Sequence, residues 1–524
     1  MPLDAGERWK RTAAGLVALF GAALLLHAPI REFSDPDALY HARHAWIERT
    51  QGFWRGDFPW VQFSAIRREG SDLWYGFHVL LMPFTLGSDL LAGIRLAGIA
   101  ISFGCLALVW AALRRLEIRG SLFWTIAFAA ATGDSLFRIT MVRPHPLSLG
   151  LALLLFAFAC EERPSRGAVI ATAALFAWIH MALAWVPVLL FLAVAGGRLL
   201  RRERPPFACA GWTAVGLVLG VVARPNPVGG LRLASIQVLT WLAGRSAKVP
   251  LDVGRELKPF VWIHFTGQLV PLTIVVAAAI ALVALDGNGD PGDRGRRVRT
   301  MSALALLAIF AAMTFAVARR SNDFLVAFAA IFAGLAASSA LAWLRDRLGF
   351  LRGGLLAVMA VSVVVAATRS VDRFRGYATA IPGSERLRDA AVWLRDHASE
   401  GDVVFNVHWD QFAPLFFWNP RCYYVTGNDP IFFYAFDPRL YGIAHQLESD
   451  ALIVDGSRGL VREAPPGESG DLEELHDALS KQFHAAWILV QKARTPHLAA
   501  FLSGTRGFGL AYETPGEFVF RILP

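Results

Sequence analysis

Long apolar runs alternate with short polar segments along most of this 524-residue chain. Many of the runs approach the twenty or so residues that a helix needs to cross a bilayer. The pattern predicts a polytopic α-helical membrane protein with about eleven spans. The expected spans cover approximately residues 12–30, 88–113, 121–139, 146–160, 167–182, 184–199, 207–223, 266–285, 301–318, 323–343 and 350–368.

The pattern changes near residue 370, where helical spacing begins to alternate with short apolar strands. The stretch "GSERLRDAAVWLRDHASEG" predicts a helix that ends at a glycine, and "DVVFNV" and "AAWILVQ" predict strands. The end of the chain, "FGLAYETPGEFVFRIL", predicts a closing hairpin. We therefore expect a transmembrane domain over 1–369, with a long first outer loop at about 31–87, and a compact α/β domain over 370–524.

Composition and charge narrow the class of protein. A chain with 55% hydrophobic and 18% charged residues is not an ordinary soluble protein. The net charge of +9 arises largely from Lys and Arg in short connections such as "RRLEIR" and "RLLRRER". In membrane proteins, basic residues in such loops determine the orientation of the spans. The positive charge is therefore not a sign of nucleic-acid binding. This distribution predicts a cytoplasmic N-terminus and an extracytoplasmic C-terminal domain. The 4 cysteines offer neither a disulfide framework nor a zinc-ligand spacing.

Candidate chemistry begins directly after the first span, in "FSDPDALYHARHAW". Carboxylates near a bilayer need water or a partner, and this segment carries Asp35 and Asp37. One interpretation is that Asp35 caps a helix that has Pro36 at its first position. The other is that one of the two carboxylates acts as a general base or binds a metal, with Arg43 or His41 holding it. The spacing leaves both interpretations open.

Two further segments on the predicted outer side carry cations, "GDSLFRITMVRPHPLSL" and "VARRSNDFLVAF". Guanidinium groups bind phosphate oxygens in pairs, and an imidazole can bind either a transition metal or a phosphate. Alternatively, Arg143–His145 forms an interfacial turn, and the later arginines extend from a span end toward the headgroups. The candidate residues are Arg138, Arg143, His145, Arg319, Arg320 and Asp323.

The order of these segments resembles that of the GT-C glycosyltransferases, and among them the archaeal and bacterial oligosaccharyltransferase catalytic subunits. "DALYHAR" follows the first span, and "WLRDHASEGDVVFNVHWDQF" follows the last, where that family carries a helix, a strand and a Trp-Trp-Asp motif. Downstream, "CYYVTGND" resembles the strand and turn that come next in those enzymes. In this chain the motif corresponds to His408, Trp409 and Asp410.

The resemblance implies transfer of a sugar or oligosaccharide from a polyprenyl phosphate or pyrophosphate donor to a glycan, lipid or protein acceptor. The reaction is expected on the outer face of a bacterial or archaeal plasma (inner) membrane. Asp35 matches the family's catalytic carboxylate best and Asp37 second, and a single displacement inverts the anomeric centre. Where the family has an acidic pair that helps hold a divalent cation, this chain has Arg143–His145. A Mg²⁺ or Mn²⁺ site at Asp35 and His145 and a metal-free site therefore both stay open.

The resemblance also assigns the other candidates. It implies that the donor phosphate is bound by Arg43, Arg138, Arg143, His145, Arg319 and Arg320. Acceptor binding falls to His408, Trp409 and Asp410, although Trp409 is equally suited to the core of the α/β domain. Membrane lipids are further partners, and nucleic acid is not.

Two competing functions are a transporter or flippase and a non-catalytic membrane assembly protein. Transporters often show paired halves and ionisable groups near the midplane of the membrane. Here the charged groups gather at the outer ends of the spans and no two halves match, which favours the enzyme.

Overall fold

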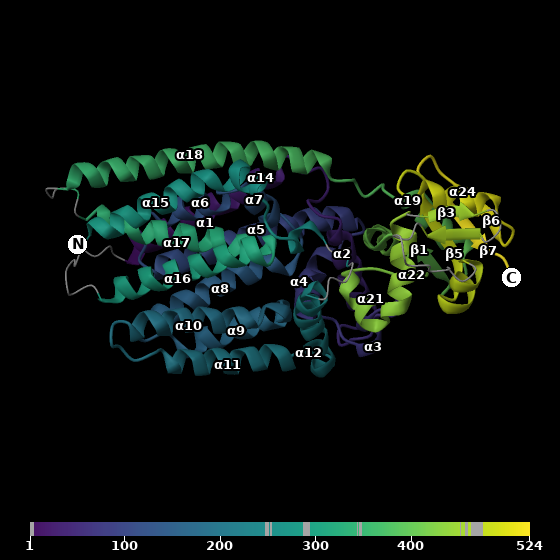
Figure 1. The fold of residues 1–524 in the computed structure, drawn as a ribbon. Helices are drawn as coiled ribbons and strands as arrows, with labels where there is room; N and C mark the ends of the chain where they lie inside the picture. The colour runs from purple at the N-terminus through teal and green to yellow at the C-terminus, as the bar shows by residue number, and fades with distance from the viewer. Residues whose placement is uncertain are drawn as a thin grey trace. The chain divides into compact units, whose positions relative to one another are not determined.

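The computed structural model describes residues 5–246, 251, 254–286, 294–342, 344, 348–450, 452–455, 459–462 and 475–524 (Figure 1). The chain divides into two compact units. The first unit contains Met1–Asp35, Ala92–Ala223 and Gly254–Ile381. The second unit contains Pro36–Leu91, Arg224–Val253 and Pro382–Pro524. Most of the first outer loop thus belongs to the same unit as the C-terminal segment.

The first unit consists of helices in its described residues, many of them running side by side (Figure 1). The long apolar ones are α1 (Ala5–His27), α5 (Leu90–Arg115), α8 (Pro144–Cys160), α9 (Arg166–Ile179), α10 (Trp185–Leu199), α11 (Phe207–Val222), α15 (Val270–Leu285), α16 (Arg294–Ala316), α17 (Asn322–Ala340) and α18 (Gly349–Ala380). The short ones are α6 (Ser121–Ala129), α7 (Gly133–Ile139), η2 (Met181–Leu183), η4 (Arg255–Leu257), α14 (Trp262–His264), η5 (Phe265–Leu269) and η6 (Arg319–Ser321).

The prediction of a polytopic helical membrane protein is confirmed. Among the described residues, 7 helices are long and apolar enough to cross a membrane, or up to 9 if each of two bent helix pairs forms one span. The predicted number of about eleven spans stays a prediction, because shorter apolar helices such as α9 do not reach the required length by themselves.

The helix α17 forms the centre of the first unit, since every one of its residues is buried. Its sequence is rich in Ala, Gly and Ser, and such small residues let neighbouring helices approach closely. A Cβ atom on Gly334 would lie 2.8 Å from the Ile118 side chain, so the neighbouring chain leaves no room for one at this position. The helix α17 is therefore closely packed against its neighbours on all sides.

The span predicted over about 121–139 is not one continuous helix. The helix α6 ends at Ala129, and α7 starts after Thr132, whose side chain accepts a hydrogen bond from the Ser135 amide. At about 1.5 Å per residue, neither piece is long enough to cross the hydrocarbon core alone. A bend of 103° then separates α7 from α8, which begins at Pro144. This broken region carries several of the candidate residues.

The second unit mixes helices and strands. Its helical elements are α2 (Asp37–Gln51), α3 (Ala65–Glu69), α4 (Tyr75–Leu81), η1 (Met82–Thr85), α12 (Pro227–Ser235), η3 (Ile236–Thr240), α13 (Trp241–Ser246), α19 (Arg388–His397), η7 (Trp409–Gln411), α20 (Phe412–Trp418), α21 (Pro430–Phe436), α22 (Pro438–Glu448), α23 (Leu475–Asp477), η8 (Ala478–Gln482) and α24 (Pro496–Gly504). Its strands are β1 (Val403–Asn406), β2 (Tyr423–Tyr424), β3 (Leu452–Asp455), β4 (Gly459–Arg462), β5 (Ala485–Gln491), β6 (Phe508–Glu513) and β7 (Glu517–Ile522).

The main sheet has the strand order β2-β1-β5-β7-β6. The strand β1 pairs in parallel with β2 and β5, whereas β7 pairs antiparallel with β5 and β6. The first outer loop extends the β2 edge, because the Tyr424 amide donates to Trp60 O and the Gln62 amide donates to Tyr424 O, each at 2.8 Å. The strands predicted from "DVVFNV" and "AAWILVQ" and the closing hairpin are confirmed.

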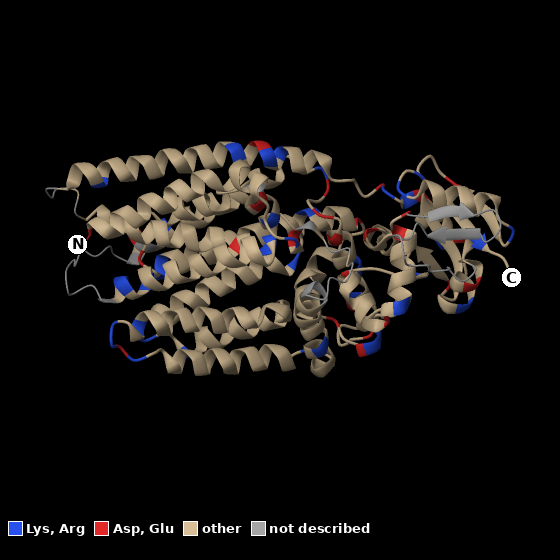
Figure 2. Ribbon diagram, viewed as in Figure 1, with Lys and Arg blue, Asp and Glu red and all other residues tan. Residues whose placement is uncertain are grey.

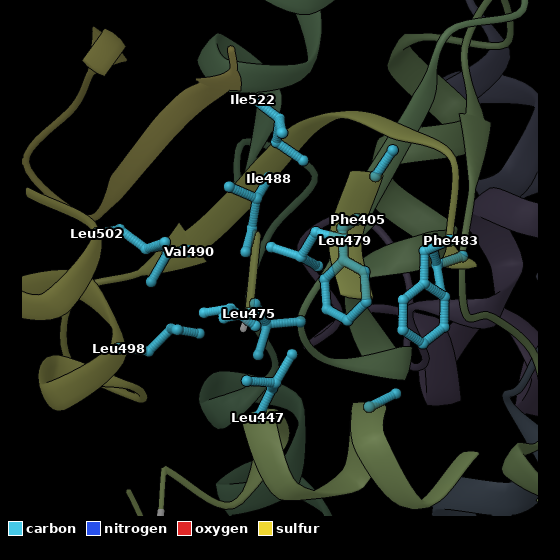
Figure 3. Packing of buried hydrophobic residues seen from close by; sticks show 14 of the residues in the cluster. Phe405, Leu447, Leu475, Leu479, Phe483, Ile488, Val490, Leu498, Leu502 and Ile522 are labelled. Carbon is cyan, nitrogen blue, oxygen red and sulfur yellow. The ribbon is translucent and has the colours of Figure 1, made fainter. Parts of the chain in front are cut away.

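One hydrophobic core lies between this sheet and the helices that pack on it (Figure 3). Phe63 from the first outer loop also packs against it. The residues that Figure 3 labels are Phe405, Leu447, Leu475, Leu479, Phe483, Ile488, Val490, Leu498, Leu502 and Ile522. The expected α/β module at the C-terminal end of the chain is thus present, and it includes part of the first outer loop.

Candidate functional site

Charged residues of the first unit gather near the ends of its helices and are scarce along them (Figure 2). The candidate site is built from the segment after α1, the turn between α7 and α8, η4, and the segment from η6 into α17. The turn is fixed locally, because Pro144 occupies the first position of α8, where its restricted φ suits a helix start.

The segment after α1 is joined to the α7–α8 turn by an ion pair. Arg143 binds Asp35 with two nitrogens, Nη2 lying 2.8 Å from Oδ1 and Nε contacting Oδ2. Ser34 Oγ also donates to Thr140 O at 2.7 Å. The Asp35 side chain is only 7% exposed. In the described residues α2 has no side-chain cap, so the capping interpretation of Asp35 is wrong.

A second ion pair joins the same region to the start of α17. Arg138 Nε contacts Asp323 Oδ2, and His145 Nε2 lies 2.6 Å from that oxygen. Asp323 is 4% exposed. A carboxylate shared by a guanidinium and an imidazole fixes both side chains in place.

A third ion pair is centred on Asp134. Arg319 Nε donates to Asp134 Oδ2 at 2.7 Å, and Arg319 also lies over the Phe260 ring at 5.2 Å. Asp134 Oδ1 accepts hydrogen bonds from Gln268 and Tyr377, each at 3.3 Å. The predicted outer segments around residues 134 and 319 are therefore in contact.

Glu256 lies at the edge of this arginine cluster, defined by Arg138, Arg143, Arg319 and Arg320. Its Oε1 is 3.9 Å from Arg143 Nη1. Burial alone would raise the pKa of Glu256, but Arg143, Arg320 and Arg138 together hold that pKa below its ordinary value. Arg320 Nε is buried and has no hydrogen-bond partner among the described residues. A donor of this kind is available to an incoming anion.

A small cavity of about 10 Å³ adjoins the cluster. Arg138, His145 and Asp323 line it together with Phe128, Ser135, Ile139, Pro146 and Leu149. A cavity of this size holds about one water molecule. Binding of a larger anion beside these side chains would require some of them to move.

Two candidates from the first outer loop lie in the second unit. Asp37 is the first residue of α2. Arg43 Nε and Nη2 donate to Phe417 O at 2.8 and 2.6 Å, and the guanidinium lies over the Trp46 and Phe417 rings. Burial lowers the pKa of Arg43 to about 10. These contacts make Arg43 a link between α2 and α20.

The predicted acceptor residues lie at the end of β1. His408 Nδ1 is 3.5 Å from Glu448 Oε1, and Trp409 is half-buried. Asp410 accepts from Arg386 at 3.0 Å and from Arg494 at 2.8 Å. Burial opposes ionisation of Asp410, but the two arginines lower its pKa below the ordinary value. Asp410 therefore holds the two arginine-bearing segments together within the second unit.

Sequence reasoning missed three residues of the site around the arginine cluster: Asp134, Glu256 and Gln268. Asp134 stands in the quoted segment "GDSLFRITMVRPHPLSL", where an acidic residue within one helical turn of Arg138 was an available signal. Glu256 and Gln268 are distant from the motifs along the chain, and no periodicity marks them. Only the folded arrangement brings Glu256 to Arg143 and Gln268 to Asp134.

The residues considered for a divalent cation do not form a ligand set in the described part of the first unit. The carboxylate of Asp35 is bound by Arg143, and His145 shares Asp323 with Arg138. Both candidate ligands are thus already engaged with protein side chains, and the choice between a Mg²⁺ or Mn²⁺ site and a metal-free site stays a prediction.

The structure is similar to the solved structures of two other proteins. ArnT from Cupriavidus metallidurans bound to undecaprenyl phosphate aligns with a TM-score of 0.55 at 14% sequence identity, over 99% of this chain and 99% of that chain. Arabinofuranosyltransferase AftD from Mycobacteria aligns with a TM-score of 0.57 at 17% identity, over 100% of this chain and 40% of that chain. This chain has the GT-C fold. No family model and no curated protein matches the sequence.

The GT-C fold is consistent with the order of elements found here. The expectation of a GT-C architecture from "DALYHAR" and "WLRDHASEGDVVFNVHWDQF" is thus confirmed at the level of the fold. At this identity the likeness concerns the fold, and the roles of individual residues stay predictions.

Proposed function

We propose that this chain is an integral-membrane glycosyltransferase that uses a polyprenyl-phosphate-linked or polyprenyl-pyrophosphate-linked sugar donor. The observation that carries the proposal is the arginine cluster at the helix ends of the first unit, in which Arg143 and Arg138 are held by Asp35 and Asp323. The GT-C fold supports the same class of reaction, since the ArnT structure contains undecaprenyl phosphate.

The chemistry of such a donor matches the cluster. A polyprenyl tail partitions into the bilayer, and its anionic head needs cationic hydrogen-bond donors near the ends of the helices. Guanidinium groups supply paired, charge-assisted hydrogen bonds to phosphate oxygens. Arg320, with a buried Nε that has no partner among the described residues, is the first donor we assign to the phosphate.

The proposed base is Asp35, with Asp37 as the alternative. Arg143 contacts both carboxylate oxygens of Asp35. A donor phosphate competes for Arg143 and thereby frees a lone pair of the carboxylate. Asp35 then accepts the proton of the acceptor hydroxyl or amide, the acceptor atom bonds to the anomeric carbon, and the polyprenyl phosphate leaves with the electron pair of the broken bond.

The membrane orientation belongs to the same proposal. On the ground of the basic connections we assign a cytoplasmic N-terminus, an arginine cluster on the outer side and an extracytoplasmic α/β module. A lipid-linked donor is then used outside the plasma membrane, and the acceptor is a glycan, a lipid or a protein. His408, Trp409 and Asp410 remain the proposed acceptor contacts.

Binding of undecaprenyl phosphate to the purified full chain in lipid nanodiscs tests the phosphate site. Arg320→Gln and Arg138→Gln should each weaken binding about tenfold or more, since a hydrogen bond to a charged group contributes about 1.5–3 kcal/mol. Arg201→Gln is the matched control, because Arg201 is exposed in a turn outside the cluster. Equal affinity in all three variants and the wild type would contradict the proposal.

Transfer from a radiolabelled lipid-linked sugar pool to a membrane extract tests the base. Asp35→Asn should retain undecaprenyl phosphate binding, but its rate of sugar transfer should fall by about 100-fold or more. Asp37→Asn should retain most of the transfer rate. The reverse order would assign the base to Asp37. Retained transfer in both variants would exclude a catalytic carboxylate in this segment, and lipid translocation without a transfer product would indicate a flippase.

A further inference from the structure

A second group of ionisable side chains lies in the second unit. His44 and Glu48 stand one helical turn apart on α2, and Asp72 and His78 come from the following part of the first outer loop. One nitrogen or oxygen atom from each residue can be chosen so that all four lie within 4.8 Å of one another. All four are buried, with Glu48 2% and His78 0% exposed.

The Glu48 carboxylate is buried and unpaired among the described residues. Neither of its carboxylate oxygens has a hydrogen bond with any residue that the structure describes, although both are buried. His44 Nε2 faces Oε1 at 3.7 Å, too far for a hydrogen bond. Buried polar atoms are almost always paired, and an orphaned carboxylate is a large energetic penalty. A cation placed between these atoms would remove the penalty.

The other nitrogens of the two histidines have partners of the kind that orient metal ligands. His78 Nδ1 lies 2.6 Å from Asp72 Oδ2, and His44 Nδ1 lies 3.2 Å from the Tyr40 hydroxyl. His78 Nε2 lies 2.8 Å from His41 Nδ1, and an ion bound by this nitrogen would replace that hydrogen bond. In metal sites the ring nitrogen that does not bind the ion commonly donates to such an oxygen, which fixes the tautomer and the ring orientation. His44 thereby directs Nε2 toward Glu48.

The surroundings favour a dry, preformed site. The Tyr40 and Phe58 rings lie 5.6 and 4.9 Å from the His44 ring, and the Phe77 ring lies 5.1 Å from the His41 ring.

We propose that His44, Glu48, Asp72 and His78 bind one transition-metal ion, with Zn²⁺ the best match. Two imidazoles and two carboxylates suit Zn²⁺ better than Mg²⁺ or Ca²⁺, which prefer oxygen ligands throughout. A dication and two carboxylates are electrically neutral, as a buried site requires. Tetrahedral zinc places its ligand atoms about 3.3 Å apart, so a small contraction of the observed group is sufficient.

The site is structural rather than catalytic. Its four ligands leave no open coordination position, which is the usual arrangement for structural zinc. The ion would join α2 to the segment that leads into α4, and these two elements both belong to the first outer loop. Arg224 supports the same segment from another side, since its Nη1 lies 3.2 Å from Leu73 O.

Metal analysis of the purified full chain tests this proposal independently of any transferase activity. After removal of bound metal with a chelator and titration with Zn²⁺, we expect one ion per chain with an increase in thermal midpoint. Titration with Co²⁺ should give the visible absorption of a tetrahedral site. Glu48→Gln and His44→Gln should each weaken binding on the order of 100-fold or more, because each removes a direct ligand.

Glu448→Gln is the matched control, because Glu448 also lies beside two histidines, with Oε1 3.5 Å from His408 Nδ1 and Oε2 3.9 Å from His445 Nδ1. It should bind one ion as the wild type does. If Glu48→Gln does not fold, His78→Asn and the Co²⁺ spectrum of the wild type provide the same information. Absence of stoichiometric binding by the wild type, or equal binding by the Glu48, His44 and Glu448 variants, would overturn the proposal.

Discussion

The two buried groups of ionisable side chains differ in how their charges are balanced. In the first unit each carboxylate of the cluster meets a guanidinium, as Asp35 meets Arg143 and Asp323 meets Arg138. In the second unit Glu48 lies among histidines and Asp72 with both oxygens unpaired among the described residues. Arginines cannot lose their charge and therefore attract anions, whereas neutral imidazoles with carboxylates attract metal cations.

This difference shows that burial of charge alone does not identify a ligand. Both groups are concentrated in or near the predicted outer loops, and both contain Asp and His. What separates them is the residue that faces each carboxylate. A lipid phosphate is the proposed ligand of the arginine cluster, and a zinc ion is the proposed ligand of the histidine group.

The largest expected effect comes from breaking a paired carboxylate in the first unit. Asp323→Ala leaves Arg138 buried without its partner, and loss of one member of a buried ion pair typically costs about 3–5 kcal/mol. The thermal midpoint of the full chain in detergent should fall accordingly. The double variant Arg138→Met with Asp323→Leu should recover part of this loss, and an equal or larger loss would show that the pair has a different role.

A smaller effect of opposite sign is expected at the unpaired carboxylate. Without metal, Glu48→Leu should stabilise the second unit or leave it unchanged, because it removes a buried unsatisfied group that costs about 1–3 kcal/mol. With Zn²⁺ the wild type should become the more stable protein. Thermal midpoints measured with EDTA and with Zn²⁺ distinguish these cases, and destabilisation of Glu48→Leu in EDTA would contradict the comparison.

An ion pair of intermediate exposure should give a pH-dependent effect. Asp410 forms ion pairs with Arg386 and Arg494, and its pKa in the folded protein is lowered from 3.8. The ionised carboxylate therefore stabilises the fold above pH 3.8. This contribution is lost as the pH falls through the lower pKa of the folded protein. Asp410→Asn should remove up to about 1 kcal/mol at neutral pH. Urea midpoints measured from neutral pH into the acid range should become less pH-dependent, and an unchanged profile would assign the acid sensitivity to other groups.

The smallest effect is expected for a fully surface pair. Arg55 Nη2 lies 2.8 Å from Asp57 Oδ2, and the two side chains are 41% and 57% exposed. Arg55→Gln should change the free energy of unfolding by less than about 0.5 kcal/mol, because water and salt screen such pairs. A larger change in urea-induced unfolding would mean that exposure is a poor guide to the value of ion pairs in this chain.

Much of the architecture could be predicted from hydrophobic periodicity. The apolar runs predicted a helical membrane protein. The alternating pattern after residue 370 predicted the strands β1, β5, β6 and β7. The break between α6 and α7 was missed, because Thr132 caps α7 within a stretch that is otherwise apolar. A single polar capping residue is a weak signal in an average over twenty positions.

The candidate site could be predicted only in part, for a similar reason. Residues in compact motifs, such as Arg138 and Arg143, were identified because several polar side chains stood together in an apolar context. Glu256 was missed because it reaches the arginines only through the fold, and Arg43 binds a backbone carbonyl that no local pattern reveals.

The sequence by itself determined where helices form, where the chain changes to an α/β module and which segments carry chemistry, because these depend on local hydrophobicity and spacing. The tertiary structure decided which charges meet. Asp35 is paired with the guanidinium of Arg143, whereas the Glu48 carboxylate has no hydrogen-bond partner among the described residues. Val61 of the first outer loop also pairs with Tyr424 of β2. Electrostatic pairing and burial depend on distances between residues far apart in the chain, and only the packed molecule fixes those distances.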